Sequence, residues 1–424
     1  MAVNYKKRLV EGLLELNLKT MGGVLIQGSK ACGKTTTAEQ FAKSKLMLAD
    51  ERVREEAQGL IDIGPELLIA GEAPRLIDEW QVFPKLWDLL RYEIDKRDGF
   101  GQFILTGSAV PADRSGIIHS GTGRFAWVTM RPMTLVESGE SSGAISLKSI
   151  FDGRTDLVAE NKLLISDIGF VTCRGGWPRA IGFQGEEAFN FVRNFVRNVI
   201  NVDVTRASGK ACSKDRMRML LQSLARNVGT QTSLNEIHKD LTSDAPSLST
   251  AELTGYVQAL RDIFVIEDMP AWNPNLRSKT AIRTTPTRYF CDPSIAAASL
   301  GVGPEALFKD RKTFGFVFEN LCVRDLRVYA ETLSGDVFHY RDKTNLECDA
   351  VIHLDDGRYG LIEIKLGGND AVEQGVKTLK ALAAKINVDR MSEPSFLMVL
   401  TAVGQFAFRR KDGVWVVPIG CLGP

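Results

Sequence analysis

The chain has 424 residues, 44% of them hydrophobic and 25% charged, and its 53 basic and 52 acidic side chains leave a formal charge of +1. This length predicts two or three domains, and the near-zero charge neither favours nor excludes nucleic acid. No apolar run reaches the length of a membrane span, and the seven scattered cysteines suggest neither a disulfide framework nor a zinc site, so we expect a cytoplasmic protein without membrane contact. The stretch from Leu9 to Leu18 predicts a short amphipathic helix rather than a signal peptide.

A phosphate-binding pattern follows the apolar run Val24-Leu25-Ile26. It reads G-x-x-x-x-G-K-T and precedes a helical pattern, which is the strand–loop–helix context that nucleotide phosphates require. The sequence therefore predicts binding of ATP and Mg²⁺, with Lys34 on the terminal phosphates and Thr35 on the metal. Cys32 either makes the loop sensitive to oxidation or fills a variable position. The predicted nucleotide-binding residues of the loop are Gly28, Ser29, Lys30, Ala31, Cys32, Gly33, Lys34, Thr35 and Thr36.

Further strands and helices alternate after the loop, which predicts a parallel sheet covered by helices on both faces. The strand that ends in Asp78-Glu79 is typical of a Walker B strand. Asp78 would hold Mg²⁺ and Glu79 would polarise the attacking water. The strand that ends in Thr106-Gly-Ser108 places two hydroxyls where they either sense the terminal phosphate or satisfy turn backbone.

Arg124 lies in the glycine-rich segment Gly121–Phe125, ahead of a predicted strand over 126–129. Two interpretations stay open. Arg124 is either an arginine finger, supplied to the nucleotide within this chain or by a neighbouring subunit of a homo-oligomer, or an ordinary surface side chain.

The order of these motifs resembles the N-terminal ATPase module of a prokaryotic AAA-type family. G-x-x-x-x-G-K-T-T, L-I-D-E-W-Q, I-L-T-G-S-A, G-R-F and R-P-M-T-L-V-E occur in that order over about residues 20 to 140. Trp80 departs from the aliphatic residue that the family prefers. The resemblance implies a C-terminal domain of unknown function with a restriction-endonuclease-like fold. It also matches Gly175-Gly-Trp-Pro178 and Asp203 to the family's entry into the C-terminal half.

Three helical patterns between residues 215 and 270 precede a strand-like segment, which is the layout of a winged helix-turn-helix. Ser233 and Glu236 form a capping box at the second helix. The third helix carries few basic residues, so binding of DNA and a purely structural or protein-binding role stay equally open. Arg206 is either a second phosphate sensor or a solvated helix end.

The last part contains the pattern of a PD-(D/E)-x-K nuclease. Glu363 and Lys365 alternate along a strand and share one face, and the Asp356-Gly357 hairpin brings Asp349 beside them. Such a set can hold Mg²⁺ and position water against a phosphodiester. The predicted catalytic residues are therefore Asp349, Glu363 and Lys365, and the predicted metal ligands are Glu319, Asp349 and Glu363. Gln374 matches an accessory position of the same superfamily.

Together these patterns predict an α/β chain of three parts. We expect an AAA-type P-loop NTPase domain over 1–170, a helical linker with a winged-helix-like region over 171–300, and a restriction-endonuclease-like α/β domain over 301–424. The expected function is an ATPase that couples nucleotide state to a nuclease-like half that binds DNA. The alternatives are a nucleotide-dependent regulatory or scaffold protein with an inactive nuclease fold, and a small-molecule P-loop kinase, against which the long C-terminal half argues.

Overall fold

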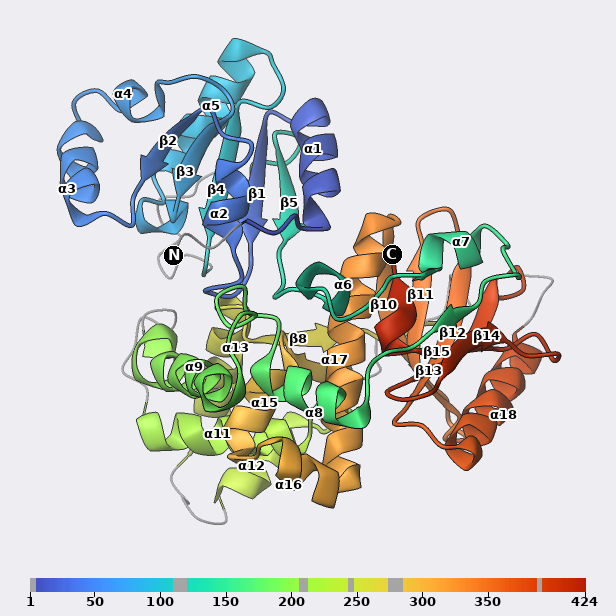
Figure 1. Cartoon of the computed structure of the whole chain (residues 1–424). Helices are drawn as coiled ribbons and strands as arrows, with labels where there is room; N and C mark the ends of the chain where they lie inside the picture. The colour runs from blue at the N-terminus through green and yellow to red at the C-terminus, as the bar shows by residue number, and fades with distance from the viewer. Residues whose placement is uncertain (1–4, 110–119, 206–212, 243–247, 274–284, 387–390) are drawn as a thin grey trace.

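The computed structural model describes residues 5–109, 120–205, 213–242, 248–273, 285–386 and 391–424. Within these ranges, no helix has both the length and the apolar character needed to cross a membrane. Figure 1 shows an N-terminal part around a parallel sheet, a helical middle part and a C-terminal part around a second sheet.

The N-terminal part is a five-stranded parallel sheet with the order β2-β3-β4-β1-β5. Alternation along the strands divides its core, because Leu25 and Leu105 pack under α3, α4 and α5 while Ile26 and Ile104 pack under α1 and α2. The predicted parallel sheet with helices on both faces is confirmed. Its strands are β1 (Gly23–Gln27), β2 (Ser44–Met47), β3 (Arg75–Asp78), β4 (Phe103–Gly107) and β5 (Phe125–Thr129), and its helices are α1 (Val10–Thr20), α2 (Lys34–Glu39), α3 (Glu51–Leu60), α4 (Glu66–Ile69) and α5 (Leu86–Arg97).

Parallel strands end at the same edge of the sheet, so the residues that follow β1, β3 and β4 meet there. The loop after β1 is forced into a tight path at Gly28, which has φ +151°. A Cβ at Gly28 would lie 2.1 Å from the carbonyl oxygen of Met130. The close approach of the loop to the segment after β5 therefore requires glycine at this position.

The middle part is helical and contains a small antiparallel sheet, β8 with β9. The three helices predicted between residues 215 and 270 are present as α11, α12 and α13. The capping box is also present, since Glu236 N–H donates to Ser233 Oγ over 3.2 Å and Ser233 N–H donates to Glu236 Oε2 over 2.8 Å. The elements are α8 (Ile165–Arg174), α9 (Gly185–Asn198), the π-helical turn η2 (Val199–Asp203), α11 (Lys214–Arg226), α12 (Leu234–Thr242), α13 (Thr250–Asp262), β8 (Ile266–Met269), β9 (Thr287–Phe290), α15 (Pro293–Leu300) and α16 (Pro304–Lys309).

The C-terminal part is a mixed sheet with the order β10-β11-β12-β13-β15-β14-β7. β10, β11 and β12 are antiparallel, and the β11–β12 pair is the hairpin that Asp356-Gly357 predicted. β12, β13 and β15 are parallel. α17 packs on one face and α18 on the other. The elements are α17 (Arg311–Thr332), β10 (Gly335–Arg341), β11 (Glu347–Leu354), β12 (Tyr359–Lys365), α18 (Asn369–Lys385), β13 (Phe396–Thr401), β14 (Phe406–Arg409) and β15 (Trp415–Pro418).

The structure differs from the predicted domain limit at residue 170. β6 (Ile145–Ser146) pairs with β16 (Leu422–Gly423), and β7 (Ala159–Glu160) pairs with β14 at the edge of the C-terminal sheet. Segment 145–160 therefore belongs to the C-terminal part. Strands of two residues are too short to show an alternation pattern, which is why the sequence did not indicate this pairing.

Candidate functional site

The phosphate loop is folded into a closed turn between β1 and α2. Lys34 is 5% exposed. Its Nζ donates to the carbonyl oxygens of Gly28 and Ser29, both over 2.8 Å. The hydroxyl of Ser29 is buried and has no hydrogen-bond partner among the described residues. A buried donor without a partner and a cation inside a glycine turn suit an anionic ligand, so the loop fits the phosphates of a nucleotide.

Asp78, at the end of β3, joins the loop to the neighbouring strand. Its Oδ1 accepts one hydrogen bond from Thr35 Oγ1 and another from Thr106 Oγ1, each over 2.6 Å. Asp78 is 2% exposed. The hydroxyl and the carboxylate predicted to hold Mg²⁺ are therefore in contact, which is the donor chemistry that Mg²⁺ prefers.

Glu79 follows in the left-handed region, with φ +57°. A non-glycine residue in this conformation is strained, and such strain concentrates at functional sites. The Oε2 of Glu79 accepts hydrogen bonds from Ser108 Oγ over 2.9 Å and from Gln81 Nε2. Its backbone N–H donates to Thr106 Oγ1 over 3.3 Å. Thr106 and Ser108 thus orient the two acids, a role that neither sequence-based interpretation of these hydroxyls included.

Arg124 lies at the wrong edge of the sheet for the nucleotide of its own chain. Phe125 is in register with Gly23 at the start of β1, whereas the phosphate loop follows the end of β1. The guanidinium instead pairs with Asp95, through Nε over 2.9 Å and through Nη2 over 3.2 Å. The prediction that Arg124 binds nucleotide within this chain is wrong, and its use by a neighbouring subunit stays a prediction.

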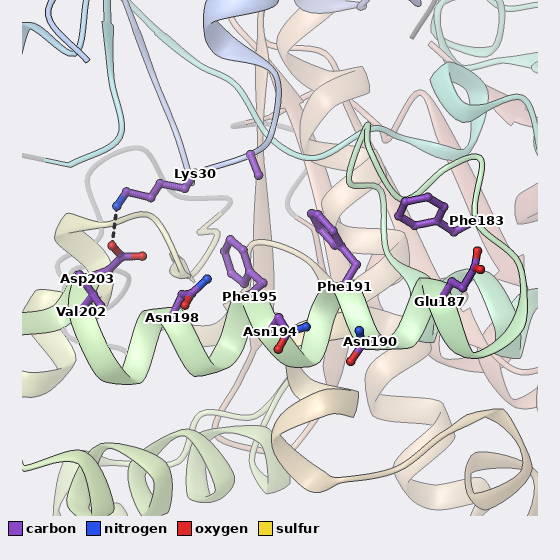
Figure 2. Close-up of a pocket in the computed structure, with 11 residues that line it drawn as sticks. Lys30, Phe183, Glu187, Asn190, Phe191, Asn194, Phe195, Asn198, Val202 and Asp203 are labelled. Carbon is purple, nitrogen blue, oxygen red and sulfur yellow. Dashed lines mark hydrogen bonds and ion pairs between the residues drawn. The ribbon is translucent and has the colours of Figure 1, made fainter. Parts of the chain in front are cut away.

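A groove of about 800 Å³ lies between the tip of the phosphate loop and α9 (Figure 2). Phe183, Phe191 and Phe195 line it, as do Asn190 and Asn194, one helical turn apart. At one end, Lys30 Nζ forms an ion pair with Asp203 Oδ1 over 2.5 Å, which Figure 2 marks with a dashed line. Arg206, which the sequence offered as a second phosphate sensor, lies outside the described residues.

The hairpin of β11 and β12 brings the predicted nuclease residues together. Lys365 Nζ lies 2.7 Å from Glu363 Oε2 and 3.2 Å from Asp349 Oδ2. The same Asp349 oxygen accepts the Ile364 N–H over 2.7 Å. The expectation that these three side chains share one surface is confirmed.

Glu319 does not join them as a metal ligand in this structure. Its Oε1 accepts a hydrogen bond from the hydroxyl of Tyr289 over 2.6 Å, and the Lys365 ammonium group forms ion pairs with the other two carboxylates. Among the described residues, no group of three or more His, Cys, Asp or Glu is arranged to hold a metal ion. The predicted metal set of Glu319, Asp349 and Glu363 is therefore not assembled here. Gln374 is exposed on α18.

The pocket over these carboxylates is composite. Its volume is about 180 Å³, and it is lined by Glu319 and Asp349 of the C-terminal part and by Gly229, Gln231 and Tyr289 of the middle part. The middle part thus covers a site that the sequence assigned to the C-terminal part alone.

The protonation of Glu363 predicts a dependence of stability on pH. Burial first and the Asp349 carboxylate second raise its pKa from 4.5 to about 8, although Lys365 opposes the shift. Between these values the native state binds a proton that the unfolded state has released, so the free energy of unfolding falls as the pH rises from 4.5 to 8. The amide in Glu363→Gln does not titrate over this range. We therefore expect a shallower fall of the melting temperature over pH 5 to 8 in this variant than in the wild type. Equal slopes would contradict the raised pKa.

Sequence reasoning missed the residues that approach these sites from the middle part. Tyr289 and Gln231 carry no motif, and Glu319 lies 30 residues from its tyrosine partner. Lys30 and Asp203 are 173 positions apart, and the sequence did not indicate that they form a pair. The spacing of Asn190, Asn194 and Asn198 was the one visible signal, because a repeat of four places polar side chains on one face of a helix.

Three family models match the chain in succession. An AAA domain covers residues 22–138, a domain of unknown function (DUF8612) covers 165–306, and another (DUF4143) covers 314–422. The chain is 24% identical over 401 residues to the uncharacterized protein Rv2008c of Mycobacterium tuberculosis and to Mb2031c of Mycobacterium bovis. In both cases the match covers 93% of this chain and 79% of the relative.

Among solved structures, the chain is similar to the Walker-type ATPase paby2304 of Pyrococcus abyssi. The sequence identity is 14%, the match covers 68% of this chain and 93% of that one, and the TM-score is 0.41. The AAA match over residues 22–138 and the parallel sheet together support an AAA-type ATPase domain in the N-terminal part. This agrees with the ATPase module that the order of sequence motifs indicated.

Proposed function

We propose that this protein binds and hydrolyses ATP at the edge formed by β1, β3 and β4, and couples its nucleotide state to a nuclease-like C-terminal half that binds nucleic acid. The observation that carries the first part is the continuous set of contacts from Thr35 through Asp78 to Thr106, beside Glu79 and Ser108. A loop, a metal-binding pair and a water-polarising acid at one edge are the parts that phosphoryl transfer to water requires.

Each residue has a distinct role in this proposal. The Gly28–Thr36 backbone and Lys34 hold the phosphates, and Thr35 and Asp78 would hold Mg²⁺, which supplies charge neutralisation on the terminal phosphates. Glu79 orients and polarises the attacking water. Ser108 and Thr106 fix the two carboxylates through the hydrogen bonds described above.

Glu79→Gln tests the hydrolytic role separately from binding. The amide keeps the size of the side chain but cannot accept a proton, so we expect hydrolysis to fall by about 100- to 10,000-fold while the affinity for ATP changes little. Phosphate release and binding of a fluorescent ATP analogue are measured for the wild type, for Glu79→Gln and for Lys45→Ala, an exposed substitution on β2. Hydrolysis at the wild-type rate in Glu79→Gln would contradict the assignment.

The contacts around Glu319 favour a second candidate, in which the nuclease-like fold is inactive and serves regulation or binding of a partner. Glu319 accepts the hydrogen bond from Tyr289, and Asp349 and Glu363 form ion pairs with Lys365. In the part of the chain that the structure describes, these carboxylates are therefore not arranged to hold a metal ion. The same ATPase reactions, run with single-stranded, duplex and branched DNA and with Mg²⁺ or Mn²⁺, separate the two candidates. Cleavage that Asp349→Ala abolishes supports a nuclease, and stimulation of the ATPase by DNA without cleavage supports the inactive fold.

A further inference from the structure

One contact joins the phosphate loop directly to the end of α9. Lys30, the third residue of the loop pattern, pairs with Asp203, the last residue of the π-helical turn η2 (Figure 2). The Lys30 side chain is 45% exposed and that of Asp203 is 9% exposed. The cation is thus the accessible partner, and the carboxylate is fixed in the middle part.

A nucleoside triphosphate would compete with Asp203 for this cation. Lys30 lies between Gly28 and Gly33, in the turn whose backbone N–H groups face the phosphates in the proposed complex. Solvent partly screens the pair because the Lys30 side chain is half-exposed, whereas a triphosphate presents several negative charges and many acceptor oxygens. Binding of the triphosphate is therefore expected to draw Lys30 away from Asp203.

The turn that carries Asp203 packs against α11. α11 has 13 residues, which gives a rigid rod of about 20 Å. Single π-turns within helices often mark functional positions. A displacement of η2 therefore has a direct mechanical route along α11.

The C-terminal end of α11 leads into the turn over 227–231, whose Gly229, Thr230 and Gln231 line the carboxylate pocket. Gly229 has φ +72°, and a Cβ there would lie 3.1 Å from Glu319 Oε1. Gln231 Nε2 lies 3.0 Å from His339 Nδ1. The Gly229 N–H donates to the carbonyl of Arg288 over 3.0 Å, which ties the turn to β9 and to the Tyr289 that bonds Glu319.

We propose that the Lys30–Asp203 ion pair is a latch that a bound nucleoside triphosphate opens, and that α11 transmits its opening to the 227–231 turn over the carboxylate pocket. This inference rests on the proposed function for ATP binding, and it adds the route by which the two sites communicate. The pocket is covered when the latch is closed. It becomes accessible when Lys30 turns to the phosphates and the turn withdraws from Glu319.

Hydrogen exchange of the full-length protein tests the latch. We measure the peptides that contain the phosphate loop and the 227–231 turn, with and without a non-hydrolysable ATP analogue and Mg²⁺. In the wild type, the analogue should slow exchange in the loop. It should speed exchange in the turn, because the Gly229 N–H loses its hydrogen bond to the Arg288 carbonyl. The expected increase is only about fivefold, since the Lys30–Asp203 ion pair that restrains the turn is weak. In Asp203→Asn, the turn should exchange at this faster rate without the analogue and should not respond to it.

Two further variants separate the latch from general loosening. Lys30→Gln and the double variant Lys30→Gln/Asp203→Asn should match the single Asp203→Asn variant in the turn, since groups that act through one contact are not additive. Glu186→Gln, which removes another ion-pairing acid from α9, should behave like the wild type. Protection of the loop without a change in the turn, or an equal response of Asp203→Asn and wild type, overturns the latch. Absence of protection in the loop instead overturns the proposed binding of ATP.

Discussion

Lys34→Ala is expected to slow ATP hydrolysis by about 100- to 1,000-fold. The ammonium group of Lys34 is the buried cation inside the phosphate loop, 2.8 Å from the carbonyl oxygens of Gly28 and Ser29. Removal of one such preorganised group from a site where negative charge develops typically slows a reaction by about 100- to 1,000-fold. The truncated side chain also leaves two loop carbonyls without their donor, so the free loop should lose its fixed shape.

Steady-state phosphate release and equilibrium binding of a fluorescent ATP analogue measure this effect. Unlike Glu79→Gln, Lys34→Ala should lose affinity as well as rate, because in the proposed complex Lys34 would contact the phosphates before and during the reaction. Lys45→Ala is the matched control, since this lysine is exposed and pairs only weakly with Glu39 over 2.9 Å. If Lys34→Ala retained full hydrolysis, the phosphate site would have to be placed elsewhere in the chain.

Local signals made most of the candidate nucleotide site predictable. The apolar run before Gly28, the glycine spacing and the following helix are all encoded within 20 residues, and the structure forms β1, the loop and α2 there. Asp78 and Glu79 follow from the same logic, because a buried strand that ends in acids must end at the edge where the loop lies. The alternation of Glu363 and Lys365 was equally local.

The error at Arg124 was avoidable from the same topology. A residue that precedes a strand of a parallel sheet lies at the edge opposite to residues that follow the strands. Arg124 precedes β5, whereas the loop follows β1, so the two lie at opposite edges. The prediction rested on an arginine in a glycine-rich segment and did not consider the direction in which β5 runs.

Contacts between distant segments could not be predicted. The hydroxyl of Tyr289 and the carboxylate of Glu319 meet because β9 of the middle part crosses α17, and the pairing of β7 with β14 joins residues almost 250 positions apart. No local pattern records such a meeting, since it depends on how complete elements pack. Tyr289 and Glu319 both line the carboxylate pocket, and for this reason the chemistry of the C-terminal half was the least predictable feature.

Arg324→Met is expected to produce the largest loss of stability. Arg324 is almost fully buried in α17 and pairs with Asp292 Oδ2 over 2.9 Å and with Asp325 Oδ1 over 2.7 Å. The two carboxylates also hold backbone groups of other segments, the N–H of Gly176 and the N–H of Leu135, each over 2.9 Å. This ion trio of Arg324, Asp292 and Asp325 thus joins the segment after the N-terminal sheet to the middle and C-terminal parts.

Methionine fills a similar volume but leaves two buried carboxylates without a cation, which typically costs about 3 to 5 kcal/mol. Burial already raises the pKa of Asp325 to about 6, against the opposing effect of Arg324, and without Arg324 the pKa should rise further. A carboxyl group whose pKa is raised in the native state binds a proton there that the unfolded state has lost, so the variant should recover stability as the pH falls from 8 to 5. Urea unfolding of the wild type, Arg324→Met and the exposed control Arg218→Met at both pH values measures this. A loss for Arg324→Met as small as that of the control, or one that does not shrink at pH 5, would show that the trio does not hold the three parts together.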